Sequence, residues 1–167
     1  MTDSKLAILI PTYGRPEKVA KLIENIEKTT KTPHRIYVIA EGKDKPTIDL
    51  VTELSATLPV VLIKNKAPYT YVSAINWGYY CSTEPFVYCA ADDVWFTKHW
   101  DVAVVDLLEQ GYGFVGTKDD WVISKTKKHA SHFAVSRKYI DEQGGVLDQK
   151  GVIYHPGYYH YQCDIET

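Results

Sequence analysis

Residues 5–16 read KLAILIPTYGRP, and this stretch decides the fold class. Its first half, Lys5 to Ile10, is a short apolar run, and its second half is a turn rich in proline and glycine. A short apolar run closed by turn residues is typical of a strand buried on both faces, as in a parallel sheet. After Pro16, apolar residues return at helical spacing, with Glu17 where the helix dipole favours an acid. We therefore predict a strand followed directly by a helix.

The same alternation of strand and helix continues along the chain. We expect further strands near residues 35–40, 60–63, 85–91, 113–116 and 132–135, and further helices near 47–58, 72–81, 99–110 and 137–143. A length of 167 residues fits one domain with one proper core. The pattern predicts a single α/β domain, residues 1–167, with a mostly parallel central sheet flanked by helices.

The composition excludes some classes of protein. Hydrophobic residues make up 45% of the chain and charged residues 24%, with a formal net charge of −2, which is the ordinary range of soluble globular proteins. Nucleic-acid surfaces need clustered Lys and Arg. The one tight basic group, at residues 125–128, fits a solvated loop better than a phosphate contact. We expect no nucleic-acid surface.

The cysteines and the apolar runs predict the compartment. Three cysteines, with no CxxC spacing, fit reduced, mostly buried thiols better than a disulfide framework. No apolar run reaches the roughly 18 residues needed to span a bilayer, and no signal peptide is visible. We expect a cytoplasmic protein without a membrane span.

Polar side chains follow three of the predicted strands. In open α/β sheets, ligands bind beyond the carboxyl ends of the strands. The side chains that should meet in one crevice there are Thr12, Tyr13, Arg15, Glu41, Asp92 and Asp93. The sequence thus predicts a ligand site at this edge without naming the ligand.

The chain lacks the glycine-rich motifs of common nucleotide sites. There is no G-x-G-x-x-G after the first strand and no G-x-x-x-x-G-K-[ST] anywhere. Those motifs let backbone amides approach phosphates. A bound diphosphate would need to be neutralised in another way, and a divalent metal held by carboxylates is the obvious candidate.

Asp92 and Asp93 are the candidate carboxylates, because they close an apolar strand. Mg²⁺ and Mn²⁺ prefer oxygen ligands, and Mg²⁺ typically takes one or two carboxylates plus phosphates and waters. Adjacent strand side chains point to opposite faces, so we predict Asp93 on the metal and Asp92 on the donor ribose or sugar. The alternative is a solvated turn or helix N-cap. A second pair, residues 119–120, fits an exposed loop better than a metal or sugar site.

Four stretches together resemble the inverting family 2 glycosyltransferases, which adopt the GT-A fold, a Rossmann-like nucleotide-binding sandwich. They cover roughly residues 5–100, and their order and spacing carry the likeness. Residues 8–16 resemble the opening strand and its Pro-Thr-(Tyr/Phe)-x-Arg turn, and 38–42 the second strand with its acidic end. Residues 73–78 resemble the Ala-Arg-Asn-x-Gly helix, and 86–93 the strand that delivers an Asp-x-Asp motif.

The resemblance implies roles for these positions. It assigns to the nucleotide pocket Pro11, Thr12, Tyr13, Arg15, Glu41, Asn76 and Asp92, and it assigns the metal, Mn²⁺ or Mg²⁺, to Asp93. Three residues depart from the family pattern. Ala91 replaces the first acid of Asp-x-Asp, which puts metal affinity in doubt, and Ile75 stands where an Arg often contacts the donor. Glu41 replaces the usual Asp.

The resemblance also implies a catalytic base near the end of the chain. In this family it is an acid at the start of a late helix, and the best match is Asp164, with Glu166 as its neighbour. A transfer with inversion needs a carboxylate to take the proton of the attacking hydroxyl. The alternative, that both acids lie on the solvated first turn of a helix, stays open. His132, His155 and His160 could add a metal ligand, but a lone histidine is more often structural, and the grouping of His155, His160 and Cys163 fits no zinc pattern.

The expected activity is metal-dependent transfer of a sugar from a nucleotide diphosphate donor, a UDP-sugar by preference, to an acceptor hydroxyl whose identity the sequence leaves open. Residues 1–100 would form the nucleotide-binding half, and 101–167 the acceptor and catalytic half. Two alternatives remain: a non-catalytic nucleotide- or carbohydrate-binding module, and a sugar-1-phosphate nucleotidyltransferase. The early end of the chain indicates a truncated or natural minimal version, and the small size resembles compact phage-encoded relatives.

Overall fold

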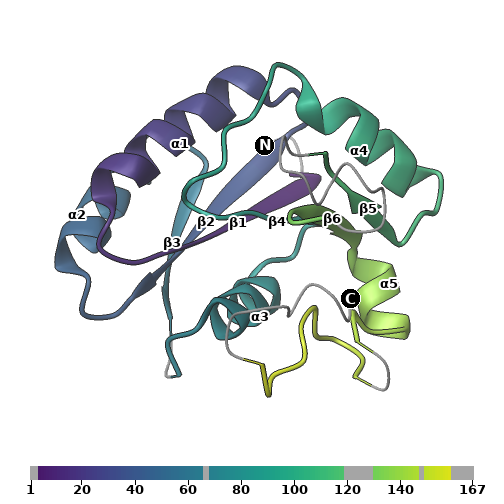
Figure 1. Cartoon of the computed structure of the whole chain (residues 1–167). Coiled ribbons are helices and arrows are strands. Elements are labelled where there is room, and N and C mark those ends of the chain that lie inside the picture. The colour runs from purple at the N-terminus through teal and green to yellow at the C-terminus, as the bar shows by residue number, and fades with distance from the viewer. Residues whose placement is uncertain (1–3, 66–67, 119–129, 147–148, 159–167) are drawn as a thin grey trace.

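The computed structural model describes residues 4–65, 68–118, 130–146 and 149–158. Helices and strands alternate as the sequence predicts (Figure 1). The strands are β1 (Leu6–Thr12), β2 (His34–Glu41), β3 (Val60–Asn65), β4 (Phe86–Cys89), β5 (Phe114–Gly116) and β6 (Phe133–Ser136). The helices are α1 (Pro16–Thr29), α2 (Lys45–Leu54), α3 (Tyr71–Cys81), α4 (Trp100–Glu109) and α5 (Arg137–Glu142). The predicted α/β class is confirmed.

The six strands form one sheet in the order β3-β2-β1-β4-β6-β5. β3, β2, β1 and β4 are parallel, whereas β6 runs antiparallel to both β4 and β5. The predicted mostly parallel sheet is therefore confirmed. The order reverses at β1, since the chain builds outward from β1 to β3 and then crosses to β4 on the other side. Such a switch point leaves a crevice beyond the carboxyl ends of the central strands.

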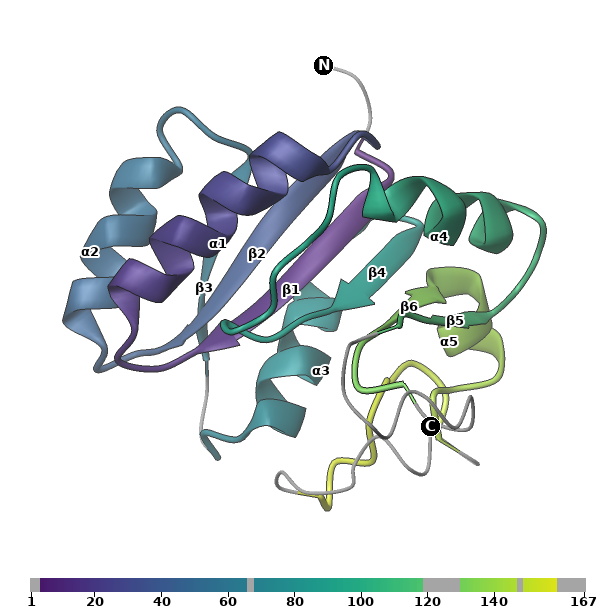
Figure 2. The ribbon, with the colours of Figure 1, turned by 45° about the horizontal axis from the view of Figure 1, so that its top comes forward.

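Helices cover both faces of the sheet and make two cores (Figure 2). Alternation along β1 shows the division: Leu6, Ile8 and Ile10 face the first core, and Ala7 and Leu9 face the second. Helices α1, α2 and α4 pack on the first face, and α3 and α5 on the second. Because the central strands are buried on both sides, their sequences read as continuous apolar runs.

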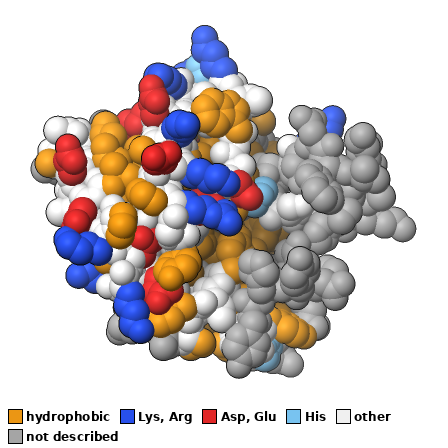
Figure 3. Space-filling model, turned by 60° about the vertical axis from the view of Figure 1, so that its left-hand side comes forward, with side chains coloured by type: hydrophobic (Ala, Val, Ile, Leu, Met, Phe, Trp, Pro, Cys, Tyr) orange, Lys and Arg blue, Asp and Glu red, His pale blue; other side chains and the backbone are white. Residues whose placement is uncertain are grey.

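The surface charges and the helix lengths relate to the expectations on nucleic-acid binding and on membrane spans. On the face shown in Figure 3, the described acidic and basic side chains are interspersed rather than separated by sign. In the described part of the chain, every helix falls short of the length and apolar character that a bilayer crossing requires.

Candidate functional site

A cleft of about 750 Å³ opens at the carboxyl ends of β1, β2, β3 and β4. Its walls come from segments far apart in sequence: Pro11, Thr12, Tyr13, Arg15, Ile39, Glu41, Asn65, Tyr69, Thr70, Tyr71, Ala74, Ala91, Asp92 and Asp93. The structure therefore brings together all six polar side chains that the sequence placed at this edge. We call this cavity the first cleft.

The carboxylate of Asp92 ties the end of β4 to the turn after β1. One oxygen accepts a hydrogen bond from the Thr12 hydroxyl at 2.9 Å, and the other pairs with the Arg15 guanidinium at 2.8 Å. Asp92 is 8% exposed, while the Arg15 side chain is 50% exposed. A charged group this buried needs such partners. The pair fixes the position of Arg15 at the mouth of the first cleft.

Asp93 has different surroundings from its neighbour. Its side chain is exposed and lines the first cleft. Among the described residues, none donates a hydrogen bond to its carboxylate, and no group of three or more His, Cys, Asp or Glu side chains is gathered as a metal cage. Asp93 thus offers an open carboxylate at the cleft, which could hold a cation only together with oxygens of a ligand and water.

Asp44, a residue that the sequence analysis missed, holds the turn after β1 at the cleft. Its carboxylate accepts a hydrogen bond from the N–H of Gly14 at 2.7 Å. Gly14 adopts φ +67°, a backbone conformation that residues other than glycine rarely take. Asp44 is buried and is also the N-cap of α2, where it accepts a hydrogen bond from the N–H of Thr47. The signal in the sequence was the Asp two residues before Pro46, an N-cap followed by a proline in the first turn.

The wall after β3 was also missed. Tyr69, Thr70 and Tyr71 line the first cleft beside the start of α3. Thr70 is the N-cap of that helix, and its hydroxyl accepts from the N–H of Ser73 at 3.0 Å in a capping box. The sequence analysis looked for ligand contacts beyond the carboxyl ends of β1, β2 and β4. The same search beyond the end of β3 finds this wall.

Among the described residues, the charges that line the first cleft do not balance. They are three carboxylates, Glu41, Asp92 and Asp93, and one guanidinium, Arg15. Because Arg15 is paired with Asp92, the negative charge of Glu41 and Asp93 is left over. A diphosphate would be repelled by this surface unless a cation entered with it. The described lining of the first cleft therefore carries a net negative charge.

The structure does not bring Asn76 to the first cleft. Its amide nitrogen donates to the carbonyl of Tyr154 at 2.8 Å, and its amide oxygen accepts from the N–H groups of Ile153 and Tyr154 at 3.1 Å. These three bonds hold the late segment against α3. The side chain on which the resemblance placed a donor contact is thus engaged in fixing buried backbone.

Several predicted positions lie outside the described residues. They are the expected base Asp164, its neighbour Glu166, the aspartates at 119–120, the lysines at 125–128, His160 and Cys163. Of the remaining cysteines, Cys89 is buried, whereas Cys81 is exposed, against the expectation of mostly buried thiols.

A mostly parallel sheet with a switch point and carboxylates beyond its carboxyl edge is typical of α/β proteins that bind a ligand in the crevice at that edge. The chain belongs to glycosyl transferase family 2, whose family model matches residues 7–165. The GT-A fold predicted from the resemblance is confirmed.

Individual proteins are similar to this chain in sequence or in fold. The uncharacterized glycosyltransferase YwdF of Bacillus subtilis (strain 168) is 26% identical over 134 residues, which are 80% of this chain and 48% of that protein. The mannosyltransferase PcManGT from Pyrobaculum calidifontis, solved in complex with GDP-Man and Mn²⁺, matches with a TM-score of 0.72 at 17% identity, over 95% of this chain and 55% of that chain. S. aureus TarS 1–349 in complex with UDP matches with a TM-score of 0.56 at 14% identity, over 67% and 34%. The chain spans about half the length of the first two relatives.

Proposed function

We propose that this chain binds a nucleoside diphosphate sugar, a UDP-sugar by preference, with a divalent cation in the first cleft, and transfers the sugar to an acceptor hydroxyl with inversion. The observation that carries the proposal is the unbalanced negative charge of the described lining of the first cleft, in a chain of glycosyl transferase family 2. The related PcManGT was solved with GDP-Man and Mn²⁺, and TarS with UDP, which supports this class of donor.

The residues of the cleft fit a cation of the Mn²⁺ or Mg²⁺ type. Such an ion accepts one or two protein carboxylates and completes its shell with phosphate oxygens and water. Asp93 offers one open carboxylate, and Asp92 is already paired with Arg15. Asp93 would hold the cation, and a cation held there would supply the positive charge that stabilises a departing diphosphate. Asp92 would contact the ribose or sugar of the donor while its carboxylate stays bonded to Thr12 and Arg15.

The other residues of the cleft would position the donor. Tyr13 and Tyr69 are exposed aromatic side chains on its walls, suited to pack against a nucleobase, and Glu41 can accept hydrogen bonds from base or ribose. Pro11 and Thr12 form the wall at the end of β1. Arg15 has half its side chain exposed and can donate further bonds to phosphate oxygens.

The transfer itself moves one bond and one proton. The acceptor oxygen forms a bond to the anomeric carbon, while the bond from that carbon to the diphosphate oxygen breaks and its electron pair stays on the diphosphate. The proton of the acceptor hydroxyl goes to a carboxylate, for which Asp164 is our candidate, with Glu166 beside it. Attack from the side opposite the diphosphate inverts the anomeric centre.

The cation and donor assignments are tested by thermal unfolding with nucleotides. We expect UDP with Mn²⁺ to raise the melting temperature of the wild type by several degrees, since a ligand at one hundred times its Kd adds about 2.7 kcal/mol. Asp93→Ala should abolish the shift. A panel of UDP, GDP, CDP and ADP, each with and without Mn²⁺, ranks the nucleoside.

The matched control is Asp106→Ala, which removes an exposed aspartate of α4 that lies outside the first cleft. It should keep the full response to UDP and Mn²⁺. An identical response of wild type and Asp93→Ala would refute the cation assignment, and a lack of response to every nucleotide would refute the donor class.

Turnover separates a transferase from a binding module. We expect slow hydrolysis of a UDP-sugar by the wild type, measured as release of UDP, and its loss in Asp164→Asn with UDP binding retained. Equal hydrolysis by both proteins would remove Asp164 from the mechanism, and binding without any release would favour the module.

A further inference from the structure

A second cleft, of about 810 Å³, lies on the other side of Asp93 from the first. Its lining residues come from β4 and the segment after it, from α4, and from the end of β5 and the start of β6: Tyr88, Asp93, Val94, Trp95, Phe96, Thr97, Trp100, Ala103, Val104, Leu107, Val115, Gly116, Thr117, Lys118, Ser131 and His132. Asp93 is the one described residue that lines both clefts.

The two clefts approach Asp93 from opposite faces of the sheet. Ile39 and Ala74 of the first cleft belong to the core under α3, whereas Tyr88, Val104 and Val115 of the second belong to the core under α1 and α4. Because the two clefts share Asp93, a ligand in the second cleft would lie beside a donor held in the first.

The floor of the second cleft is fixed by aromatic packing. The ring of Trp100 lies 4.6 Å from the ring of Tyr88 and 4.3 Å from that of Phe96, measured between centroids. Asn25 of α1 holds Phe96 from behind, since its amide donates to the Phe96 carbonyl at 3.0 Å and accepts from the Phe96 N–H at 2.8 Å. A floor held in this way keeps its shape when a ligand arrives.

The rim of the second cleft combines an exposed aromatic ring with polar groups. Trp95 is 70% exposed, which is a large apolar area to leave in water, and it follows Asp93 by two residues. Lys118 and Ser131 add a cationic and a hydroxyl group to the same cleft. An indole face packs well against the C–H face of a pyranose ring, while polar groups at the edge bond to its hydroxyls.

We propose that the second cleft is the acceptor subsite and binds a carbohydrate whose ring packs on Trp95. The inference rests on the proposed function, because it takes the first cleft as the donor site. It adds the chemical class of the acceptor and the residue that recognises it. Trp95 is a specificity-determining residue here and takes no part in bond breaking.

The test observes Trp95 directly in protein loaded with UDP and Mg²⁺, because paramagnetic Mn²⁺ held at Asp93 would broaden the signal of Trp95, two residues away, beyond detection. The probes are the methyl glycosides of glucose, galactose, mannose and N-acetylglucosamine, titrated while the indole N–H signals are followed by two-dimensional NMR. Trp95→Phe identifies the Trp95 signal. We expect that signal to move and saturate with at least one glycoside, while the Trp77 signal, from α3 on the opposite face, stays in place.

Two variants and a control complete the experiment. Trp95→Ala should weaken glycoside binding about tenfold, as expected for loss of an aromatic anchor. Ala103→Phe, at an exposed position of α4 in the same cleft, should weaken it by narrowing the cleft. Tyr80→Ala removes an aromatic ring that is 76% exposed on α3, and it should leave the affinity for the glycosides unchanged. All three should keep the melting shift with UDP and Mn²⁺.

The outcomes separate the two proposals. If UDP and Mn²⁺ stabilise the protein but no glycoside moves the Trp95 signal, the acceptor subsite is wrong and the donor site stands. If glycosides bind equally well to wild type and Trp95→Ala, the role of Trp95 is wrong. If UDP and Mn²⁺ give no shift, the proposed function fails, whatever the glycosides do.

Discussion

Two aspartates that are adjacent in sequence have different surroundings in the fold. Asp92 is 8% exposed and engages Thr12 and Arg15, whereas Asp93 is exposed between two clefts. The expectation that strand alternation separates the two does not hold, because β4 ends at Cys89 and both aspartates lie in the turn after it. Which of them is buried follows from the pairing of β1 with β4, because that pairing brings the turn after β1 to Asp92.

Arg15 compensates the charge of Asp92, and removal of the Arg15 side chain should lower the free energy of unfolding. Arg15→Ala leaves the Asp92 carboxylate with the Thr12 hydroxyl as its side-chain partner. We expect a loss of about 1 kcal/mol in unfolding free energy, at the low end for a buried charged group because Arg15 itself is half exposed. Urea denaturation measures the loss. Lys18→Ala, which removes an exposed cation of α1, should cost less, and equal costs would contradict the prediction.

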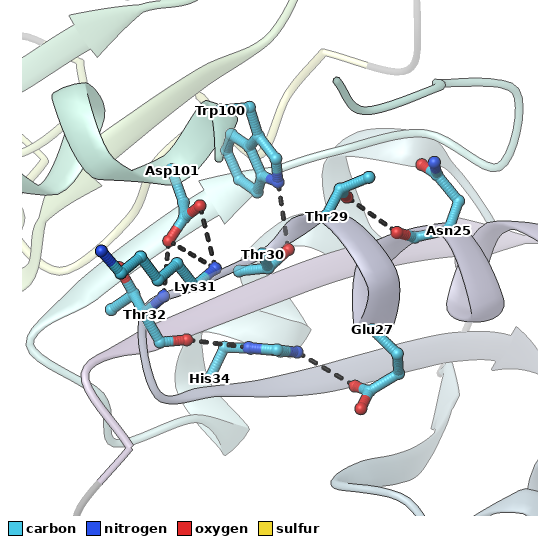
Figure 4. A network of polar contacts seen from close by, with 9 residues as sticks. All are labelled: Asn25, Glu27, Thr29, Thr30, Lys31, Thr32, His34, Trp100 and Asp101. Carbon is cyan, nitrogen blue, oxygen red and sulfur yellow. Dashed lines mark hydrogen bonds and ion pairs between the residues drawn. The ribbon is translucent and has the colours of Figure 1, made fainter. Parts of the chain in front are cut away.

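At the scale of elements, a polar junction joins the end of α1 to the start of α4 (Figure 4). Asp101 is fully buried and accepts hydrogen bonds from the N–H of Thr32 at 2.6 Å and of Lys31 at 3.1 Å. Beside it, the Trp100 indole N–H donates to the Thr30 hydroxyl at 3.0 Å. The junction sets the position of α4 and hence of the second cleft.

This junction should make stability depend on pH. Burial by itself raises the pKa of Asp101, but the hydrogen bonds from Thr32 and Lys31 together outweigh it, so the pKa lies below its ordinary value. A carboxyl with a lowered folded pKa contributes stability that is complete above its unfolded pKa, about 3.9, and is lost as pH falls through the folded value. Acidification should therefore weaken this junction.

Asp101→Asn tests that dependence, because asparagine keeps one acceptor oxygen and loses the charge. We expect a cost of about 1.5–3 kcal/mol at neutral pH, as for hydrogen bonds to a charged group. The gap between wild type and variant should narrow below about pH 4. Urea unfolding across this range measures it, with Asp106→Asn as the exposed control on α4. A gap that stays constant with pH would show that the charge is unimportant.

At the scale of the whole molecule, the first cleft depends on strands from both sides of the switch point. β1, β2 and β3 bring Arg15, Glu41 and the wall after Asn65, and β4 brings the aspartates. Since one open carboxylate binds a cation weakly, cation and diphosphate should each improve the affinity of the other.

Ligand removal tests this coupling. We expect Mn²⁺ alone and UDP alone to shift the melting temperature little, and the two together to shift it by more than the sum of the separate shifts. Addition of EDTA to the loaded protein should return the melting temperature to that of UDP alone. Calorimetric titration of UDP with and without Mn²⁺ provides a second measure. Equal UDP affinity in both conditions would contradict the coupling.

The sequence by itself determined the local structure and the candidate first cleft. Apolar runs and helical spacing have short periods, so the residues that encode each strand or helix lie within it. The rule that ligands bind beyond the carboxyl ends of parallel strands then selects Thr12, Arg15, Glu41, Asp92 and Asp93 from the sequence, and the structure brings them together. The roles given to Asp164 and Glu166 remain predictions, since these residues lie outside the described part of the chain.

The tertiary structure alone decided what depends on strand order and on contacts between distant residues. It set the antiparallel β6 beside β4, the bond of Asn76 to backbone 78 residues away, and the aromatic floor of the second cleft. None of these has a repeating pattern in the sequence. They arise when the sheet closes in one order, because only then do side chains that are far apart along the chain come within contact distance.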